Sequence, residues 1–133
     1  MKKIENIMIT GSITSAGEES LEIYEILVQE LIPYANKIYS PIDTIEFKGT
    51  NEEMYIRTMK ILQETDLVIA EMSSPSTGQG MELQEAVRLN IPIIIVAKKG
   101  SKISSTVLGS GKIKDTLFYN NKEEIKDIFA NGL

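Results

Sequence analysis

The stretch Asp66-Leu-Val-Ile-Ala-Glu71 is apolar at all four of its central positions, and Ile93-Ile-Ile-Val-Ala97 repeats this pattern further along the chain. A strand that alternates apolar and polar residues has one face in water, whereas a continuously apolar strand is buried on both faces. Helices must therefore cover both sides of the sheet that contains these two strands. Such covered sheets are typically parallel, with helical connections between their strands.

The segments on either side of this stretch alternate between short apolar runs and helical patterns. This order predicts an α/β protein with a single domain over residues 1–133, built as a Rossmann-like or flavodoxin-like three-layer sandwich around a five-stranded parallel sheet. We expect strands at residues 4–10, 37–40, 66–71, 93–97 and 117–119, and helices at residues 18–34, 51–64, 80–90, 104–108 and 123–129.

The composition narrows the classes of function. The chain has 133 residues and a formal net charge of −5, so we do not expect it to bind a nucleic acid, because that binding depends on clustered Lys and Arg. It contains no cysteine and no histidine, which excludes disulfides, thiol nucleophiles, Ser-His-Asp triads and metal sites built on imidazole or thiolate. We expect chemistry from carboxylates and hydroxyls, with no metal and no cofactor.

The N-terminal residues lack the apolar stretch of a signal peptide, and no apolar run reaches the roughly 20 residues that span a bilayer. We therefore expect a cytoplasmic protein with no membrane partner. In parallel sheets of this kind, ligands bind beyond the carboxyl ends of the strands, where the strand order reverses. That rule selects three loops, at residues 11–17, 73–80 and 98–105, as the walls of a small-molecule site.

The first of these loops, Gly11-Ser-Ile-Thr-Ser-Ala-Gly17, follows a strand and opens a helix. Its backbone amides and the hydroxyls of Ser12, Thr14 and Ser15 suit a phosphate at a helix N-terminus. Taken alone, such a loop is more often an ordinary connection between a strand and a helix. The segment Gly109-Ser-Gly-Lys112 lacks the rest of a phosphate-loop motif and is interpreted as a surface loop.

The second loop ends in Gly78-Gln-Gly80, followed by Glu82. The two glycines do not form a dinucleotide fingerprint, because they follow the third strand and lack a third glycine. They allow the chain to pass close to a ligand as it enters a helix. We expect Glu82 in the first turn of that helix, where a carboxylate also has a purely structural explanation as a partner of the helix dipole.

These residues also carry a resemblance to a known family. The segment 66–92, DLVIAEMSSPSTGQGMELQEAVRLNIP, resembles the core signature of the nucleoside 2-deoxyribosyltransferase-like superfamily, and in particular the 2'-deoxynucleoside 5'-phosphate N-hydrolases. The loop Gly11-Ser12-Ile13 and the pair Ile103-Ser104 are similar to two further parts of the same group. The resemblance implies that Glu82 is a nucleophile that attacks the anomeric carbon and forms a glycosyl-enzyme ester.

The resemblance also assigns residues that bind the substrate. Ser76 stands where the transferases have an Asp that accepts from the 5'-hydroxyl, and a serine at this position implies a 5'-phosphate. Ser104 matches a serine that reaches the phosphate from a neighbouring subunit, which implies a homodimer with the site near its interface. The implied substrate-binding set is Gly11, Ser12, Ile13, Thr14, Ser76, Gly78, Gly80 and Ser104.

The sequence departs from the family at three positions of the expected pocket. Thr58 stands where the family has an Asp that handles the proton of the leaving base, and Met8 replaces a Tyr that helps to exclude a 2'-hydroxyl. Thr14 replaces an Arg of the phosphate loop. Either Glu71 takes over as the acid, or the substrate carries a good leaving group, or catalysis has been lost.

Three functions follow from these features. The first is hydrolysis of the N-glycosidic bond of a ribo- or deoxynucleoside 5'-monophosphate through Glu82. The second is base exchange by a deoxyribosyltransferase, which Ser76 disfavours. The third is a catalytically silent protein that binds or senses nucleotides, which Thr58 favours.

Overall fold

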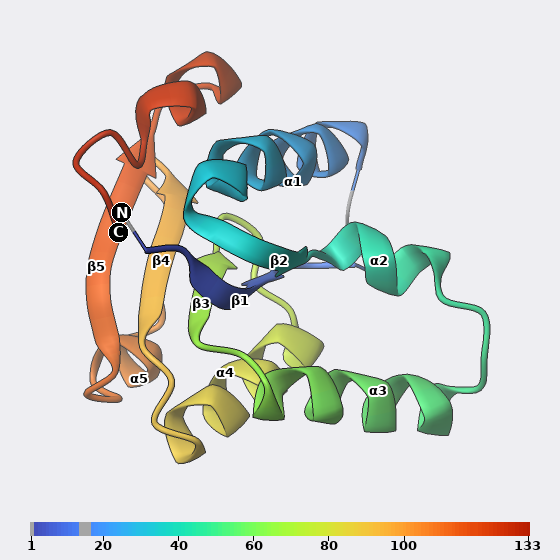
Figure 1. Cartoon of the computed structure of the whole chain (residues 1–133). Coiled ribbons are helices and arrows are strands. Elements are labelled where there is room, and N and C mark those ends of the chain that lie inside the picture. The colour runs from blue at the N-terminus through green and yellow to red at the C-terminus, as the bar shows by residue number, and fades with distance from the viewer. Residues whose placement is uncertain (1, 14–16) are drawn as a thin grey trace.

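A computed structural model describes residues 2–13 and 17–133 of the chain (Figure 1). Thr14, one of the residues assigned to the phosphate loop, lies outside the described residues. The helices and strands follow one another in the order β1 (Ile4–Thr10), α1 (Glu18–Leu31), η1 (Ile32–Tyr34), β2 (Ala35–Tyr39), α2 (Pro41–Glu46), α3 (Asn51–Gln63), β3 (Leu67–Glu71), α4 (Thr77–Arg88), β4 (Ile93–Lys98), α5 (Ser105–Leu108), β5 (Ile113–Tyr119) and η2 (Lys122–Asp127), where η marks a 3₁₀ helix.

All five strands join one sheet in the order β2-β1-β3-β4-β5, and every neighbouring pair is parallel. The predicted α/β sandwich with a five-stranded parallel sheet is therefore confirmed. The chain runs from β1 to one edge at β2 and then returns to the other side of β1 at β3. The strand order thus reverses between β1 and β3, and a crevice opens beyond their carboxyl ends.

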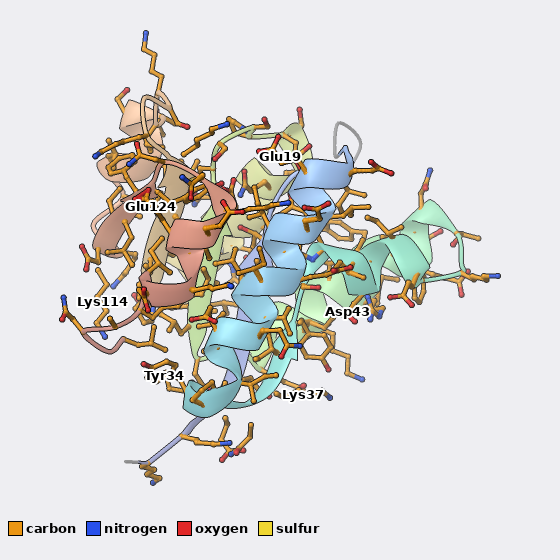
Figure 2. All side chains as sticks on the ribbon, turned by 90° about the horizontal axis from the view of Figure 1, so that it is seen from above. Glu19, Tyr34, Lys37, Asp43, Lys114 and Glu124 are labelled. Carbon is orange, nitrogen blue, oxygen red and sulfur yellow. The ribbon has the colours of Figure 1, made fainter. Side chains whose placement is uncertain are left out.

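Two apolar layers separate the sheet from its helices. On one face, α1 and η2 lie side by side, as Figures 1 and 2 show. Tyr34, just beyond the C-terminal end of α1 in Figure 2, donates its hydroxyl to the carbonyl oxygen of Phe129 at 3.1 Å. On the opposite face, α3 and α4 pack through Leu62 and Leu83 against Val68 and Ile95.

Several element boundaries differ from those that the sequence predicts, and the larger differences concern four segments. α4 begins at Thr77 rather than Gly80, because Ser76 caps it by accepting from the amide of Gln79 at 3.3 Å. The helix α2 was not predicted, although Ser40 and Asp43 form a capping box around Pro41. β5 begins at residue 113 rather than 117, and the C-terminal segment forms a 3₁₀ helix over residues 122–127.

Gly11, the residue after β1, is covered by the aromatic ring of Tyr24 from α1. A Cβ atom at residue 11 would lie 2.6 Å from two ring carbons of Tyr24, well inside van der Waals contact. The Tyr24 hydroxyl donates to the carbonyl oxygen of Ser12 at 2.8 Å. Burial, together with the nearby charge of Glu71, raises the pKa of Tyr24 to about 12, so it stays a donor at neutral pH. Tyr24 therefore fixes the first residues of the loop after β1.

The substitution Gly11→Ala is expected to destabilise the protein by roughly 1–3 kcal/mol, because the new methyl group displaces the Tyr24 ring. Gly80→Ala is the matched control, since a Cβ atom at this helical position meets nothing within 4 Å. It is expected to stabilise α4 by about 0.5–1 kcal/mol. Urea denaturation followed by circular dichroism measures both changes, and a Gly11→Ala variant as stable as the wild type would contradict the packing described above.

Candidate active site

A cavity of about 290 Å³ lies in the crevice between the end of β1 and the start of α4. Seven of the described residues line it: Gly11, Ile13, Ser76, Thr77, Gly78, Gln79 and Glu82. Five of these are residues that the sequence analysis assigned to the site. Two hollows are larger, about 610 Å³ between α1 and α2 and about 700 Å³ between α3 and α4. Of the described residues assigned to the site, only Gly80 lines one of them, the hollow between α3 and α4.

Glu82 contributes the carboxyl group of this cavity. It is the sixth residue of α4 and therefore lies beyond the first helical turn, contrary to the sequence-based expectation. The field of the helix dipole weakens within the first turn, so it does not offset the loss of hydration at this half-buried position. Burial raises the pKa of Glu82 to about 7. Among residues 2–13 and 17–133, no ion-pair or hydrogen-bond partner engages this carboxyl.

Ser76 both caps α4 and lines the cavity. Its Oγ accepts the amide of Gln79, which leaves the hydroxyl proton able to donate to a ligand. The amides of Thr77 and Gly78 belong to the first turn of α4, where backbone donors have no partner within the helix. A hydroxyl donor and free helical amides at one point form a binding surface for an anionic oxygen.

Gly78 and Gly80 are not required by the packing of the protein. A Cβ atom built at either position meets nothing within 4 Å. Gly78 lines the cavity, whereas Gly80 lies on the side of α4 that faces the hollow shared with α3. Ser12 follows Gly11 in the chain but is only 2% exposed, so Ile13 and Gly11 form the surface of this wall.

Glu71 lies on the other side of the sheet from Glu82. Its carboxylate accepts the amide and the hydroxyl of Ser73 at 2.7 and 2.9 Å, and it also accepts the hydroxyl of Tyr119. Burial and the bond to this carboxylate raise the pKa of Tyr119 well above its usual range. Glu71 thus ties the loop after β3 to β5 and does not line the cavity of Glu82.

The structure does not bring Met8, Thr58 or Ser104 into the cavity. Met8 and Thr58 are 6% and 7% exposed, and Met8 packs in the core between the sheet and α3 and α4. Ser104 is exposed at the N-cap of α5, where its Oγ accepts the amide of Val107 at 3.4 Å. The buried Gln79 was not predicted. A glutamine between two glycines is the one local signal that draws attention to it.

No helix in the described part of the chain is long and apolar enough to cross a membrane. Over the same residues, no group of three or more acidic side chains is placed to hold a metal ion.

Comparisons with known proteins define the class and then the family. No family model matches the chain. A solved 2-deoxyribosyltransferase of Bacillus psychrosaccharolyticus superposes with a TM-score of 0.71 at 15% identity, over 95% of this chain and 94% of that chain. A solved CMP N-glycosidase of Clostridium botulinum superposes with a TM-score of 0.67 at 17% identity, over 92% and 96% of the two chains. The protein has the 2-deoxyribosyltransferase fold.

Two relatives then identify the family within this class. A protein of Methanosarcina mazei, whose name places it among the 2'-deoxynucleoside 5'-phosphate N-hydrolases, is 32% identical over 137 residues, which cover 96% of this chain and 83% of the relative. A 5-hydroxymethyl-dUMP N-hydrolase of Danio rerio is 29% identical over 113 residues, or 79% and 78% of the two chains. The chain belongs to the 2'-deoxynucleoside 5'-phosphate N-hydrolase family, as its resemblance indicated.

The raised pKa of Glu82 predicts how stability depends on pH. A carboxyl whose pKa is higher in the folded than in the unfolded protein binds more protons when folded, so stability falls as the pH rises from about 4.5 to about 7. We expect Glu82→Gln to stabilise the protein at pH 8 by roughly 1–3 kcal/mol and to have little effect at pH 4.

Melting temperatures at the two pH values measure this difference. Glu85→Gln is the matched control on the same helix, because the bonds from Arg88 lower the pKa of Glu85. We therefore expect no gain at pH 8 from that substitution. A Glu82→Gln variant that is equally or less stable than the wild type at pH 8 would show that burial does not raise the pKa of Glu82 in the folded protein.

Proposed function

We propose that this protein hydrolyses the N-glycosidic bond of a ribo- or deoxynucleoside 5'-monophosphate and that Glu82 is the nucleophile. The observation that carries this proposal is a half-buried carboxyl without a partner among the described residues, placed six residues after a serine-capped helix start in the same small cavity. Membership of the family supports the reaction, because the names of the relatives state N-hydrolysis of nucleoside 5'-phosphates.

The chemistry proceeds in two displacements at the anomeric carbon. In the first, a carboxylate oxygen of Glu82 bonds to C1', and the bond from C1' to the base nitrogen breaks with its electron pair leaving on the base. In the second, water attacks C1' and the ester bond to Glu82 breaks, which regenerates the carboxylate. Overall, the hydroxyl of one water joins the sugar 5-phosphate and one proton joins the base.

The phosphate is assigned to the start of α4. The hydroxyl of Ser76 and the amides of Thr77 and Gly78 offer donors and no negative charge there. A carboxylate at residue 76 would repel a phosphate, whereas these donors stabilise it. Glu82 lies about 9 Å further along the helix axis, given a rise of about 1.5 Å per residue, and its side chain faces the same cavity. The helix start can therefore bind the 5'-phosphate while the carboxyl of Glu82 reaches the anomeric carbon of the same sugar.

The proton that the leaving base needs does not come from Glu71 in this proposal. Its carboxylate lies on the opposite face of the sheet and is engaged by Ser73 and Tyr119. Among the described residues that line the cavity, Glu82 is the sole acid, and Thr58 cannot supply a proton. We therefore expect the fastest cleavage for bases that leave readily without an acid.

We also propose that the protein acts as a homodimer in the cytoplasm. Tyr55 of α3 and Met81 of α4 are both 53% exposed and line the same hollow between the two helices, which forms an apolar surface beside the start of α4. Exposed apolar surfaces of this kind typically bind another protein. Ser104 is exposed and outside the cavity of its own chain, so it is available to the site of a partner chain.

The reaction is tested with a panel of ribo- and deoxynucleoside 5'-monophosphates and chromatographic detection of free base. We expect the wild type to release base, with kcat/KM falling about tenfold per pH unit below pH 7, because Glu82 must be ionised to attack. Glu82→Ala should release none, whereas Glu85→Ala, on the same helix but outside the cavity, should match the wild type.

Base release by Glu82→Ala at the wild-type rate would exclude Glu82 as the nucleophile. A free acceptor base added to the reaction tests the alternative chemistry, since a new nucleotide would identify a transferase. Nucleotides that raise the melting temperature without any base release would identify the silent binding protein, which the loss of an acid at Thr58 favours.

The shared site is tested by mixing two inactive chains. If each site combines Glu82 of one chain with Ser104 of its partner, mixed dimers of Glu82→Ala and Ser104→Ala chains contain one intact site each. A statistical mixture should then recover about a quarter of the wild-type activity after unfolding and refolding together. Activity no higher than the sum of the separate variants would contradict a shared site.

Met81→Lys, which places a charge in the apolar surface, is expected to sediment as a monomer.

A further inference from the structure

Gln79 is a fully buried polar residue in the first turn of α4, with 1% of its surface exposed. Its Nε2 donates to Thr10 Oγ1 at 3.2 Å and to the carbonyl oxygen of Glu71 at 2.8 Å. Thr10 ends β1 and Glu71 ends β3, and these two strands are neighbours in the sheet. One amide group therefore connects α4 to both strands that flank the crevice.

This connection spans the two walls of the candidate active site. Beyond Thr10, the chain continues into Gly11 and Ile13, which form one wall. The other wall contains Ser76, the N-cap three residues before Gln79, and Glu82, three residues after it in α4. The two hydrogen bonds of Gln79 thus link the two walls beneath the cavity. The apolar core below does not supply this link, because hydrophobic contacts have no preferred direction.

The amide is retained at an energetic cost. Oε1 of Gln79 is buried and has no hydrogen-bond partner in the described part of the chain. An unpartnered buried acceptor loses its hydration without compensation, a cost that a methionine of similar length would avoid. The Glu71 carbonyl can only accept, so Nε2 must face it and Oε1 cannot exchange places with it. Residues that violate a local rule in this way are concentrated at functional sites.

We propose that Gln79 is a positioning residue, which holds the nucleophile Glu82 and the phosphate-binding residues at the spacing that attack on the anomeric carbon requires. The inference rests on the proposed function, and it assigns Gln79 no contact with the reacting atoms. Gln79 acts through the backbone of α4 and the end of β1. A misplacement of about 1 Å between reacting groups typically costs about 100-fold in rate. Loss of the two hydrogen bonds should therefore reduce kcat much more than it changes KM.

The test compares Gln79→Met with Gln84→Met, which makes the same substitution at an exposed position of α4. We expect Gln79→Met to reduce kcat by roughly 10–100-fold with KM within about threefold of the wild type, and Gln84→Met to change neither. Hydrogen exchange followed by mass spectrometry provides a readout independent of activity. Amides of residues 10–13 and 76–82 should exchange faster in Gln79→Met than in the control.

The variant Thr10→Val adds a nearly isosteric change that removes one of the two acceptors. We expect a smaller loss of kcat than for Gln79→Met, and no additional loss in the double variant, because both substitutions remove the same interaction. Thr10→Val also tests the inference if Gln79→Met does not fold.

Wild-type kcat in Gln79→Met, or an additive loss in the double variant, would overturn the positioning role. Unchanged hydrogen exchange at residues 10–13 and 76–82 would overturn it as well. A wild-type protein that releases no base contradicts the proposed function instead, and the exchange measurement then decides whether Gln79 fixes the spacing of the two walls.

Discussion

The two central strands, β3 and β4, are surrounded by apolar side chains, so an unpaired polar side chain on them would be strongly destabilising. β3 and β4 have strands on both sides and helices above and below, so their side chains face apolar layers in either direction. Burying a polar group is costly unless hydrogen bonds satisfy it. Such groups therefore gather where the strands end, and Thr10, Glu71 and Gln79 lie together at that edge. The site occupies this edge because loop amides and side chains there can satisfy one another.

Two electrostatic effects act near the start of α4: the helix N-terminus favours a bound anion, and burial disfavours the charge of Glu82. The unpaired amides at the helix start favour an anion at Ser76, and this effect weakens within one turn. Glu82 lies past that turn, where burial favours the neutral carboxyl. A substrate phosphate would thus bind at the helix N-terminus. The carboxyl of Glu82, with a pKa of about 7, is then partly protonated and partly ionised at neutral pH. A nucleophile at the cap itself would compete with the phosphate for the same donors.

The sequence predicts the sheet and the edge that holds the site, because continuous apolar strands and the switch-point rule are local or topological signals. The predicted start of α4 at Gly80 was wrong, because the Ser76 cap outweighs the low helix propensity of Gly78 and Gly80. The prediction also missed the first residues of β5, because the charged Lys114 and Asp115 interrupt the apolar pattern. Both side chains are exposed on this edge strand. The role of Gln79 could not be predicted, because its partners lie 69 and 8 residues away and meet only in the folded chain.

Gly78 and Gly80 have a consequence for how such a protein diversifies. Side chains added at these positions extend into open space instead of into the packed layers. At Gly78, which lines the cavity, a single substitution can therefore narrow the pocket and leave the sheet, the Gln79 bonds and the core untouched. A ligand of a different shape can then be accommodated through α4 alone, while the rest of the scaffold keeps its packing.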